Sequence, residues 1–491
     1  MQKPACWNGD PECGHLVAHP YQTHYCTYIR VPKLLCLQQP AGDHPDELLA
    51  VLALQAFELW FKVLLNDLAA VLAELQGSPS AVQLTKLLNR ASRLVRLLDG
   101  QADVAETILL HDLGLRLSLD VEQGEQPSDQ FRRLKALTER TATALAQAKP
   151  GDPRLLRAGQ DYLGRFKRWS PRFEQLLQDL IDPAGTGAPG YPQYLHLETL
   201  LALQAGVKAD WTPIGQSPQG HSPTELLSPD ELLFIVVHQV FELWFRAQLH
   251  ELDAVLLNLA SELPDAAGAS RRLRRVVRLQ ILLVDMIHIP ATMLPLDFLQ
   301  FRAQTRIIDG LTYERGLSPA SGTESYQFRE LEIAAGLKEN AAHAELLHGN
   351  RRMHIRFLTP AQAERLNQPS LPQAFRHSLE ARGVQDLIGI FQPAQVSNPH
   401  ADLAELADLL LEFDKFFQLW RMNHLTMVQS MIGRKSGTGF LGPEYLKETV
   451  GMGIQAEDDR LLPTPQIRPR FFEDLWEART RMSAEGRGSD G

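Results

Sequence analysis

The chain has 491 residues, of which 44% are hydrophobic and 22% are charged, and its formal net charge is -10 at pH 7. This length and composition are typical of a globular protein with more than one domain, and the negative charge argues against a nucleic-acid-binding surface. No apolar run approaches the roughly 20 residues that cross a bilayer, and the start of the chain lacks a secretory signal, so we expect no membrane association and a cytoplasmic location.

The first 24 residues are rich in Pro, Gly and His, and we expect them to form an irregular arm. All four cysteines, Cys6, Cys13, Cys26 and Cys36, lie within or just after this arm. Their spacing matches no common zinc pattern. Thiols without disulfide bonds are therefore expected here in preference to a metal site.

From residue 46 onward the hydrophobic pattern predicts helices and almost no strands. Long helices are expected at 46–75, 81–98, 130–148, 155–181, 230–246, 269–289 and 403–432. The segment 182–190 is dense in Gly and Pro and is expected to be a linker. The sequence therefore predicts an all-α fold.

Two stretches of the chain repeat each other. Residues 44–75 match residues 228–259 at 17 of 32 positions with an offset of 184, and the Tyr-x-x-Tyr segment that begins at Tyr25 returns at Tyr191 with an offset of 166. The two offsets differ by 18, which indicates a loop insertion around 207–221 in the second copy. A repeat of this kind indicates a duplicated structural unit.

The two copies differ at positions that matter for chemistry. Leu54 stands where the second copy has His238, and Ala50 stands where it has Phe234. We interpret the first copy as one that keeps the packing and has lost the functional side chains. The predicted organisation is an arm at 1–24, a degenerate repeat at 25–185, a complete functional domain at 186–478 and a disordered tail at 479–491.

A second histidine, His424, lies on a helical stripe of aromatic and Met side chains that includes Trp420 and Met427. Either histidine alone is more often a core residue, but two of them on separate apolar helices favour a flat cofactor such as haem. Arg302 follows an apolar segment and fits either a surface ion pair or a fork for a carboxylate. The loop around Thr438 is glycine-rich and either flexible or able to close over a ligand.

The second part of the chain resembles the tryptophan 2,3-dioxygenase family over about residues 186–478. The resemblance is carried by Tyr191-x-x-Tyr194-Leu195, by Asp230-Glu231-x-Leu-Phe234-x-x-x-His238-Gln239-x-x-Glu242-Leu-Trp244-Phe245, by Pro295-Leu-Asp-Phe298-x-x-Phe-Arg302, by Ser318-Pro-Ala-Ser321-Gly322, by Trp420-Arg421-x-x-His424 and by Gly437-Thr438-Gly439. These motifs occur in the family's order. The first repeat resembles only the amino-terminal third of the same family.

The resemblance implies an all-helical enzyme that uses haem b and dioxygen to open the indole ring of tryptophan, giving N-formylkynurenine. It implies His424 as the axial ligand of the iron and His238 as the catalytic residue that binds the ring nitrogen of the substrate. The other roles that it implies are substrate binding by Phe234, Phe298, Arg302, Thr438, Tyr191 and Tyr194, and cofactor binding by Ser321, Gly322 and Trp420.

Three segments depart from the family pattern. The Ser-Gly turn continues with Thr323-Glu324, the closing loop continues with Phe440-Leu441, and about ten extra residues near 305–315 follow Arg302. A haem-dependent monooxygenase or peroxygenase that hydroxylates another aromatic amino acid, and a haem sensor without turnover, are therefore kept as alternatives.

The family also implies an assembly. Its members are homotetramers in which the amino-terminal tyrosine segment enters the active site of a neighbouring subunit. We expect this chain to form a homo-oligomer in which residues 25–185 act either as a built-in pseudo-subunit without haem or as a duplicated helical spacer with no role at the site.

Overall fold

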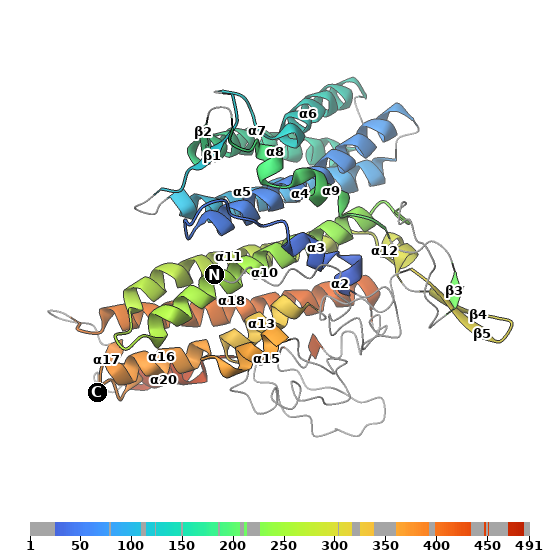
Figure 1. The fold of residues 1–491 in the computed structure, drawn as a ribbon. Helices are drawn as coiled ribbons and strands as arrows, with labels where there is room; N and C mark the ends of the chain where they lie inside the picture. Colours follow the sequence, from blue (N-terminus) through green and yellow to red (C-terminus); the bar gives the residue numbers. More distant parts are fainter. Residues whose placement is uncertain are drawn as a thin grey trace. The chain divides into compact units, whose positions relative to one another are not determined.

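The computed structural model describes most of the chain. The described residues are 25–77, 80–109, 114–122, 124–148, 151–184, 187–206, 211–213, 226–302, 304–316, 325–337, 360–391, 398–433, 446–447, 450 and 470–485. Helices dominate these residues, which confirms the predicted all-α fold (Figure 1).

The described residues fall into two compact units. Unit 1 comprises residues 26–243 and 288–316, and unit 2 comprises residue 25, residues 244–287 and the described residues from 325 onward. The first repeat and the first part of the second repeat belong to the same unit. Helix α10 (Glu231–Ala260) contributes residues to both units.

Unit 1 contains the first repeat and the start of the second. Its helices, with the short α2 that leads into them, are α2 (Tyr25–Tyr28), α3 (Val31–Leu35), α4 (Glu47–Gln76), α5 (Ala81–Leu109), α6 (Asp129–Ala148), α7 (Pro153–Leu180), α8 (Tyr191–Tyr194), α9 (Leu197–Ala202), the first part of α10, the 3₁₀ helix η1 (Pro290–Thr292) and α12 (Pro295–Phe301). Within it, α4 packs against α5 and α6, and α7 packs against α5 (Figure 1).

Helix α4 is buried around most of its circumference, which explains its almost uniformly apolar sequence. Phe57 and Phe61 lie in a cluster of aromatic rings with Phe131, Trp169 and Phe173, whose centroids are 4.8 to 6.4 Å apart in the contacting pairs. Such edge and offset contacts stabilise an interior beyond the burial of area alone. The centre of the first repeat is therefore filled by side chains.

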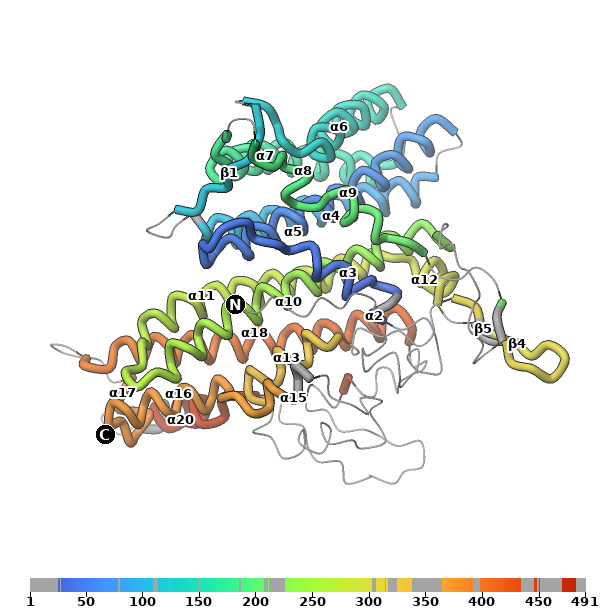
Figure 2. The backbone as a smooth tube through the Cα atoms, in the orientation of Figure 1, coloured from blue at the N-terminus to red at the C-terminus, as the bar shows by residue number. Residues whose placement is uncertain are grey.

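The two repeats share local backbone features. The bounds of α4 and α10 are offset by 184 residues at both ends. Each short tyrosine helix is followed by a residue with positive φ that begins the next short helix: Arg30 at 59° before α3 and His196 at 51° before α9. Non-glycine residues rarely adopt this conformation, so its recurrence at equivalent positions reflects the same chain path (Figure 2).

Two small sheets lie in unit 1. Strands β1 (Leu117–Leu119) and β2 (Ile181–Pro183) pair in parallel, so the start of the predicted linker is ordered. The second sheet has the antiparallel order β3-β5-β4, with bounds Thr212–Pro213, Leu311–Arg315 and Gln304–Ile308. Asp309 and Gly310, both with positive φ, form the two-residue turn between β4 and β5.

This second sheet joins the two insertions that the sequence reveals. Strand β3 comes from the extra residues near 207–221, and the β4–β5 hairpin is the extra segment after Arg302. Arg306 on the hairpin stacks 4.2 Å from the ring centroid of Trp211. The insertions thus form one local structure.

Unit 2 is a group of helices. Besides the second part of α10 it contains α11 (Ala266–Met286), α13 (Tyr326–Ala335), α15 (Pro360–Asn367), α16 (Leu371–Ala381), α17 (Leu387–Ile390), α18 (Ala401–Ile432) and α20 (Glu473–Glu485). Helix α11 packs along α18, and α13 contacts α15 and α16. Helix α20 extends to Glu485, so the predicted disordered tail does not begin at residue 479.

Two further expectations need correction. Cys36 is disulfide-bonded, so the expected thiol is wrong at this position, whereas Cys26 is a buried thiol. The expectation that no apolar run is long enough to cross a bilayer is also wrong: in the part of the chain that the structure describes, α4 and α10 are long and apolar enough to do so. The bent pair Ala266–Thr292 and Pro295–Phe301 also qualifies if the two helices are counted as one span. The most apolar stretches of α4 and α10 are 89% and 83% buried within the protein, which accounts for their composition.

Candidate functional site

Helix α10 positions His238 and Phe234 one turn apart. Their ring centroids are 4.3 Å apart, and Nδ1 of His238 lies 2.7 Å from the backbone carbonyl oxygen of Phe234. A carbonyl oxygen only accepts hydrogen bonds, so Nδ1 carries the proton and donates it. The bond fixes both the ring orientation and the tautomer of His238.

The surroundings of His238 keep it neutral. Burial lowers the pKa of His238 to about 4, and this effect exceeds the opposing influence of the carbonyl of Phe234. With the proton on Nδ1, Nε2 of the neutral ring is a hydrogen-bond acceptor at pH 7. His238 is therefore suited to receive a hydrogen bond from an N–H group.

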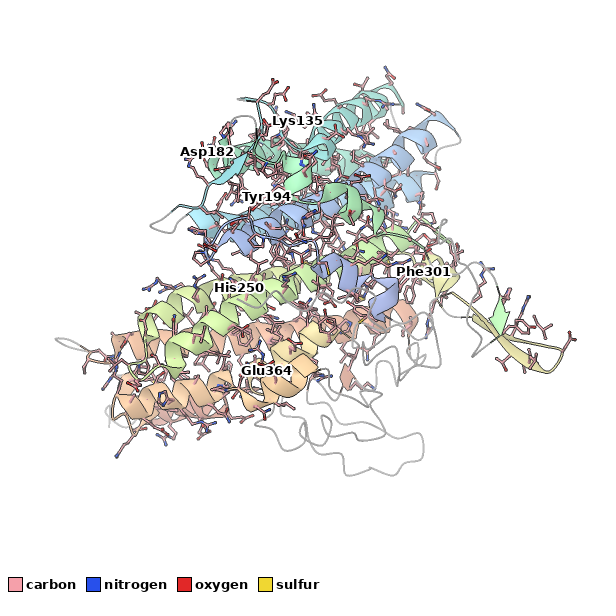
Figure 3. All side chains as sticks on the ribbon, viewed as in Figure 1. Lys135, Asp182, Tyr194, His250, Phe301 and Glu364 are labelled. Atoms are coloured by element: carbon pink, nitrogen blue, oxygen red, sulfur yellow. The ribbon has the colours of Figure 1, made fainter. Side chains whose placement is uncertain are left out.

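Helix α12 adds two more rings beside Phe234. The centroids of Phe298 and Phe301 lie 5.8 and 5.3 Å from that of Phe234, and 5.3 Å from each other. Phe301, which Figure 3 labels at the end of α12, is completely buried, and Phe298 is half-buried. These rings form an apolar wall next to His238.

Arg302 terminates α12 directly after this wall. Its backbone N–H donates to the carbonyl of Phe298 at 3.0 Å, and burial lowers the pKa of its half-buried side chain. The chain returns to this point at Gly316, which has a φ of 80° and where an added Cβ would approach the carbonyl oxygens of Phe301 and Arg302 to within 3 Å. The inserted hairpin therefore begins and ends beside Arg302.

Asp230 connects the start of α10 to α12. Its carboxylate accepts from the backbone N–H of Leu294 at 2.8 Å, from Lys86 Nζ at 2.8 Å and from Arg90 Nη1 at 2.5 Å. Burial disfavours the charge, but Arg90 and Lys86 outweigh it and lower the pKa of Asp230. Helix α5 of the first repeat thus holds together the segments that carry His238 and Arg302.

The tyrosine beside Phe234 comes from the first repeat. Tyr28 on α2 has its ring centroid 6.1 Å from that of Phe234, and its hydroxyl donates to Oε1 of Glu231 at 3.1 Å. Burial, together with the charge of Glu231, raises the pKa of Tyr28 well above its usual value, so it remains a donor. Sequence reasoning recognised Tyr28 in the repeated Tyr-x-x-Tyr motif but left open whether the first repeat contributes it to the site.

The tyrosines of the second repeat lie elsewhere. The hydroxyl of Tyr191 donates to Glu58 at 3.0 Å, and that of Tyr194, which is labelled in Figure 3, donates to Glu47 at 2.6 Å, so both pack against α4. Both are buried there. The structure therefore places the predicted substrate-binding pair on the first repeat, where Ala50 replaces Phe234.

His424 is in unit 2 on α18. Its ring stacks on that of Trp420 with a centroid distance of 5.2 Å and an interplanar angle of 29°. The ring of Trp420 lies 4.8 Å from that of Phe328 on α13 and 6.5 Å from that of Phe245 on α10. His424 itself is partly buried, and its imidazole is supported by these aromatic rings.

A buried charge network holds α13 against α18 next to these rings. Arg421 Nη2 donates to Oε1 of Glu332 at 2.7 Å, and Arg329 Nη1 donates to Oε2 of the same carboxylate at 2.6 Å. The guanidinium of Arg421 also lies 4.7 Å from the ring centroid of Phe417. Shared use of Glu332 fixes the relative position of Phe328 and Trp420.

These residues fit the chemistry of haem. Haem iron is commonly held by a single imidazole, with apolar and aromatic side chains around the plate. His424, with Trp420 and Phe328, supplies that combination, and within the described residues no group of three or more His, Cys, Asp and Glu is placed to hold a metal ion by itself. The predicted Ser321, Gly322 and Thr438 lie outside the described residues.

Comparison with known proteins decides the family. The family described as tryptophan 2,3-dioxygenase matches residues 183–387, a range that includes Phe234, His238, Phe298 and Arg302. A tryptophan 2,3-dioxygenase of Herpetosiphon aurantiacus is 32% identical over 311 residues, which cover 98% of that protein and 60% of this chain. The chain belongs to the tryptophan 2,3-dioxygenase family.

Other members are similarly related. A tryptophan 2,3-dioxygenase of Nocardioides sp. is 34% identical over 272 residues, covering 87% of that protein and 52% of this chain, and one of Saccharopolyspora erythraea is 31% identical over 313 residues, covering 92% and 60%. Members of the family are haem-dependent oxygenases, and this chain is such an enzyme. These matches span almost the whole of each relative but little more than half of this chain.

Proposed function

We propose that the enzyme inserts dioxygen across the C2–C3 bond of the indole ring of L-tryptophan, or of a close derivative, and releases an N-formylkynurenine-type product. The observation that carries this proposal is the neutral His238 with its proton fixed on Nδ1. An acceptor nitrogen beside the three rings of Phe234, Phe298 and Phe301 suits a planar aromatic ring that bears an N–H group, which describes indole.

Different side chains bind different parts of the substrate. His238 Nε2 accepts the hydrogen bond from the indole N–H and fixes the rotation of the ring. Phe234 and Phe298 contact its faces and exclude water. Arg302 binds the substrate carboxylate with its planar fork, and Thr438, by resemblance to the family, binds the ammonium group. Fixing both ends of a substrate lowers the entropic part of the barrier.

We further propose haem b as the cofactor, with His424 as the axial ligand and Trp420, Ser321 and Gly322 beside it. When bound, haem supplies the iron centre that activates dioxygen. Trp420 fixes the plane of the imidazole by stacking, and the α13–α18 charge network keeps Trp420 in place.

An optical titration of the purified protein tests the proposal. The reconstituted enzyme is expected to show a Soret band that shifts on addition of L-tryptophan, and the shift should be weaker with a tryptophan derivative methylated on the indole nitrogen, which cannot donate to His238. Equal responses to the two compounds would contradict the role given to His238, and the absence of a Soret band would contradict the cofactor.

One observation favours a second candidate. The β4–β5 hairpin is inserted directly after Arg302, and with β3 it forms a sheet at the end of the proposed substrate site. A changed environment for the substrate carboxylate is compatible with hydroxylation of another aromatic amino acid by a haem-dependent monooxygenase. The number of oxygen atoms in the product separates the two reactions. The homo-oligomeric state and the cytoplasmic location stay predictions.

A further inference from the structure

The two repeats exchange their tyrosine helices. The hydroxyl of Tyr28 in the first repeat donates a hydrogen bond to Glu231 of the second, and the hydroxyl of Tyr194 in the second repeat donates one to Glu47 of the first. Tyr28 and Tyr194 are equivalent by the offset of 166, and Glu47 and Glu231 are equivalent by the offset of 184. The same contact is therefore made twice, each time between repeats.

Buried glutamines show the same exchange through the backbone. Gln55 on α4 donates to the carbonyl of Leu195 at 3.0 Å, and its equivalent Gln239 on α10 donates to the carbonyl of Ile29 at 3.0 Å. Each glutamine also accepts from the glutamine at the end of its own repeat's tyrosine segment, Gln38 or Gln204, at 2.7 Å. All four are buried, so these bonds fix the position of each tyrosine segment.

Only one of the two exchanges reaches functional side chains. On α10, Tyr28 lies over Phe234, one turn from His238. On α4, the equivalent positions are Ala50 and Leu54, and both are completely buried. The contact of Tyr194 with α4 thus contributes packing, whereas Tyr28 borders the proposed substrate site on α10.

We infer that the first repeat of this chain supplies Tyr28 to the substrate site of the second repeat in the same chain, so that one polypeptide completes its own site. Tyr28 is then a substrate-positioning residue for the aromatic ring of the amino acid. Its hydroxyl is held by the buried carboxylate of Glu231, which keeps the phenol ring against Phe234. This role rests on the proposed function, whereas the exchange within one chain does not.

Crosslinking tests the exchange without any need for activity. Tyr28 is replaced by the photoreactive amino acid p-benzoylphenylalanine in the full-length protein, and the illuminated product is separated on a denaturing gel. We expect crosslinked material to migrate as a single chain and to yield a peptide joined to the 231–246 segment. Crosslinked dimers joined at that segment, or crosslinks to other segments, would overturn the inference.

Steady-state kinetics test the role at the site. Tyr28→Ala is expected to raise the KM for L-tryptophan roughly tenfold, with a smaller change in kcat, because it removes ground-state contacts with the ring. Tyr162→Phe is the matched control: it also removes a buried hydroxyl bond, to Thr138 at 2.6 Å, and should lower stability without changing KM. An unchanged KM in Tyr28→Ala, or a rise in Tyr194→Phe that equals it, would contradict the role of Tyr28.

A mixing experiment joins the two readouts. Chains with Tyr28→Ala and chains with Arg302→Ala are coexpressed with different tags and purified together. Because each chain carries a defect in its own site, we expect no recovery of activity. Recovery would show that Tyr28 acts in a neighbouring chain.

Failure of the wild-type enzyme to turn over L-tryptophan would contradict the proposed function, while an intrachain crosslink in the same protein would still support the exchange.

Discussion

His238 donates its Nδ1 proton to the backbone carbonyl of Phe234 at 2.7 Å, one turn earlier on the same helix. Burial of the ring outweighs the effect of this bond and lowers the pKa of His238 to about 4, so the neutral form dominates above that pH. Protonation below that value turns Nε2 from an acceptor into a donor. The affinity for L-tryptophan should therefore stay constant between about pH 8 and about pH 5 and fall as the pH approaches 4.

The Kd obtained from the Soret shift at each pH checks this prediction, with a thermal melt at each pH to confirm that the protein is folded. A loss of affinity with its midpoint near the ordinary histidine pKa of about 6.5 would show that the ring of His238 is not held in the neutral form.

Replacement of His424 tests the cofactor side of the site. His424→Ala removes the only imidazole that we assign to the iron, and stoichiometric haem should be lost while the helical fold remains. His377→Ala is the control, because His377 is exposed on α16 and contacts the carbonyl of Ser261. Haem content is measured from the absorbance ratio after reconstitution, and full haem content in His424→Ala would rule out the assignment.

Arg302 is predicted to bind the substrate carboxylate. Arg302→Ala should leave the Soret band of the substrate-free enzyme unchanged and weaken L-tryptophan binding by about 10- to 100-fold, the usual effect of losing a charge-assisted bond. Arg302→Lys keeps the charge without the planar fork and should restore only part of the affinity. Arg306→Ala, on the inserted hairpin, is the control for loss of a nearby cation, and an equal loss of affinity in that variant would indicate a general electrostatic effect.

The buried Arg90 should be among the most destabilising positions to change. It donates to Asp67 at 2.6 and 2.7 Å and to Asp230 at 2.5 Å, and it is 1% exposed. Arg90→Met leaves two buried carboxylates without their shared cation, so the free energy of unfolding should fall by about 3–5 kcal/mol. Denaturant titration of the haem-loaded protein measures this change.

Arg172 provides the comparison for Arg90. It also contacts several carboxylates, those of Asp99, Asp103 and Glu106, but these lie at the surface. Arg172→Met should cost about 1 kcal/mol or less, because water and salt screen exposed pairs. A loss as large as that of Arg90→Met would show that burial does not decide the cost.

Much of the helical fold follows from the sequence, since long apolar periodicity is a strong local signal. The predicted helices 46–75 and 130–148 agree closely with α4 and α6. The prediction ended α5 too early, near residue 98, because Gly100 looks like a helix terminus. Burial of Ala102, Ala105 and Ile108 carries the helix onward to Leu109.

The site was predictable only in part. Phe234 and His238 belong to one sequence motif and Phe298 belongs to another, and the structure brings the three side chains together. The partner of Phe234 was not predictable, because two equivalent tyrosine segments have almost the same local sequence, and only the tertiary fold decides which of them packs on α10. The β4–β5 hairpin was missed, although its Asp309-Gly310 turn is a recognisable local signal.

The most direct test of the proposed function is the mass of the product formed in a single turnover with isotopically labelled dioxygen. Haem-loaded enzyme is mixed with one equivalent of L-tryptophan and labelled dioxygen, and the product is analysed before exchange with water. We predict an N-formylkynurenine that contains both atoms of the labelled molecule. A product that contains only one labelled oxygen atom, with the indole ring intact, would contradict dioxygenation and identify the enzyme as a monooxygenase.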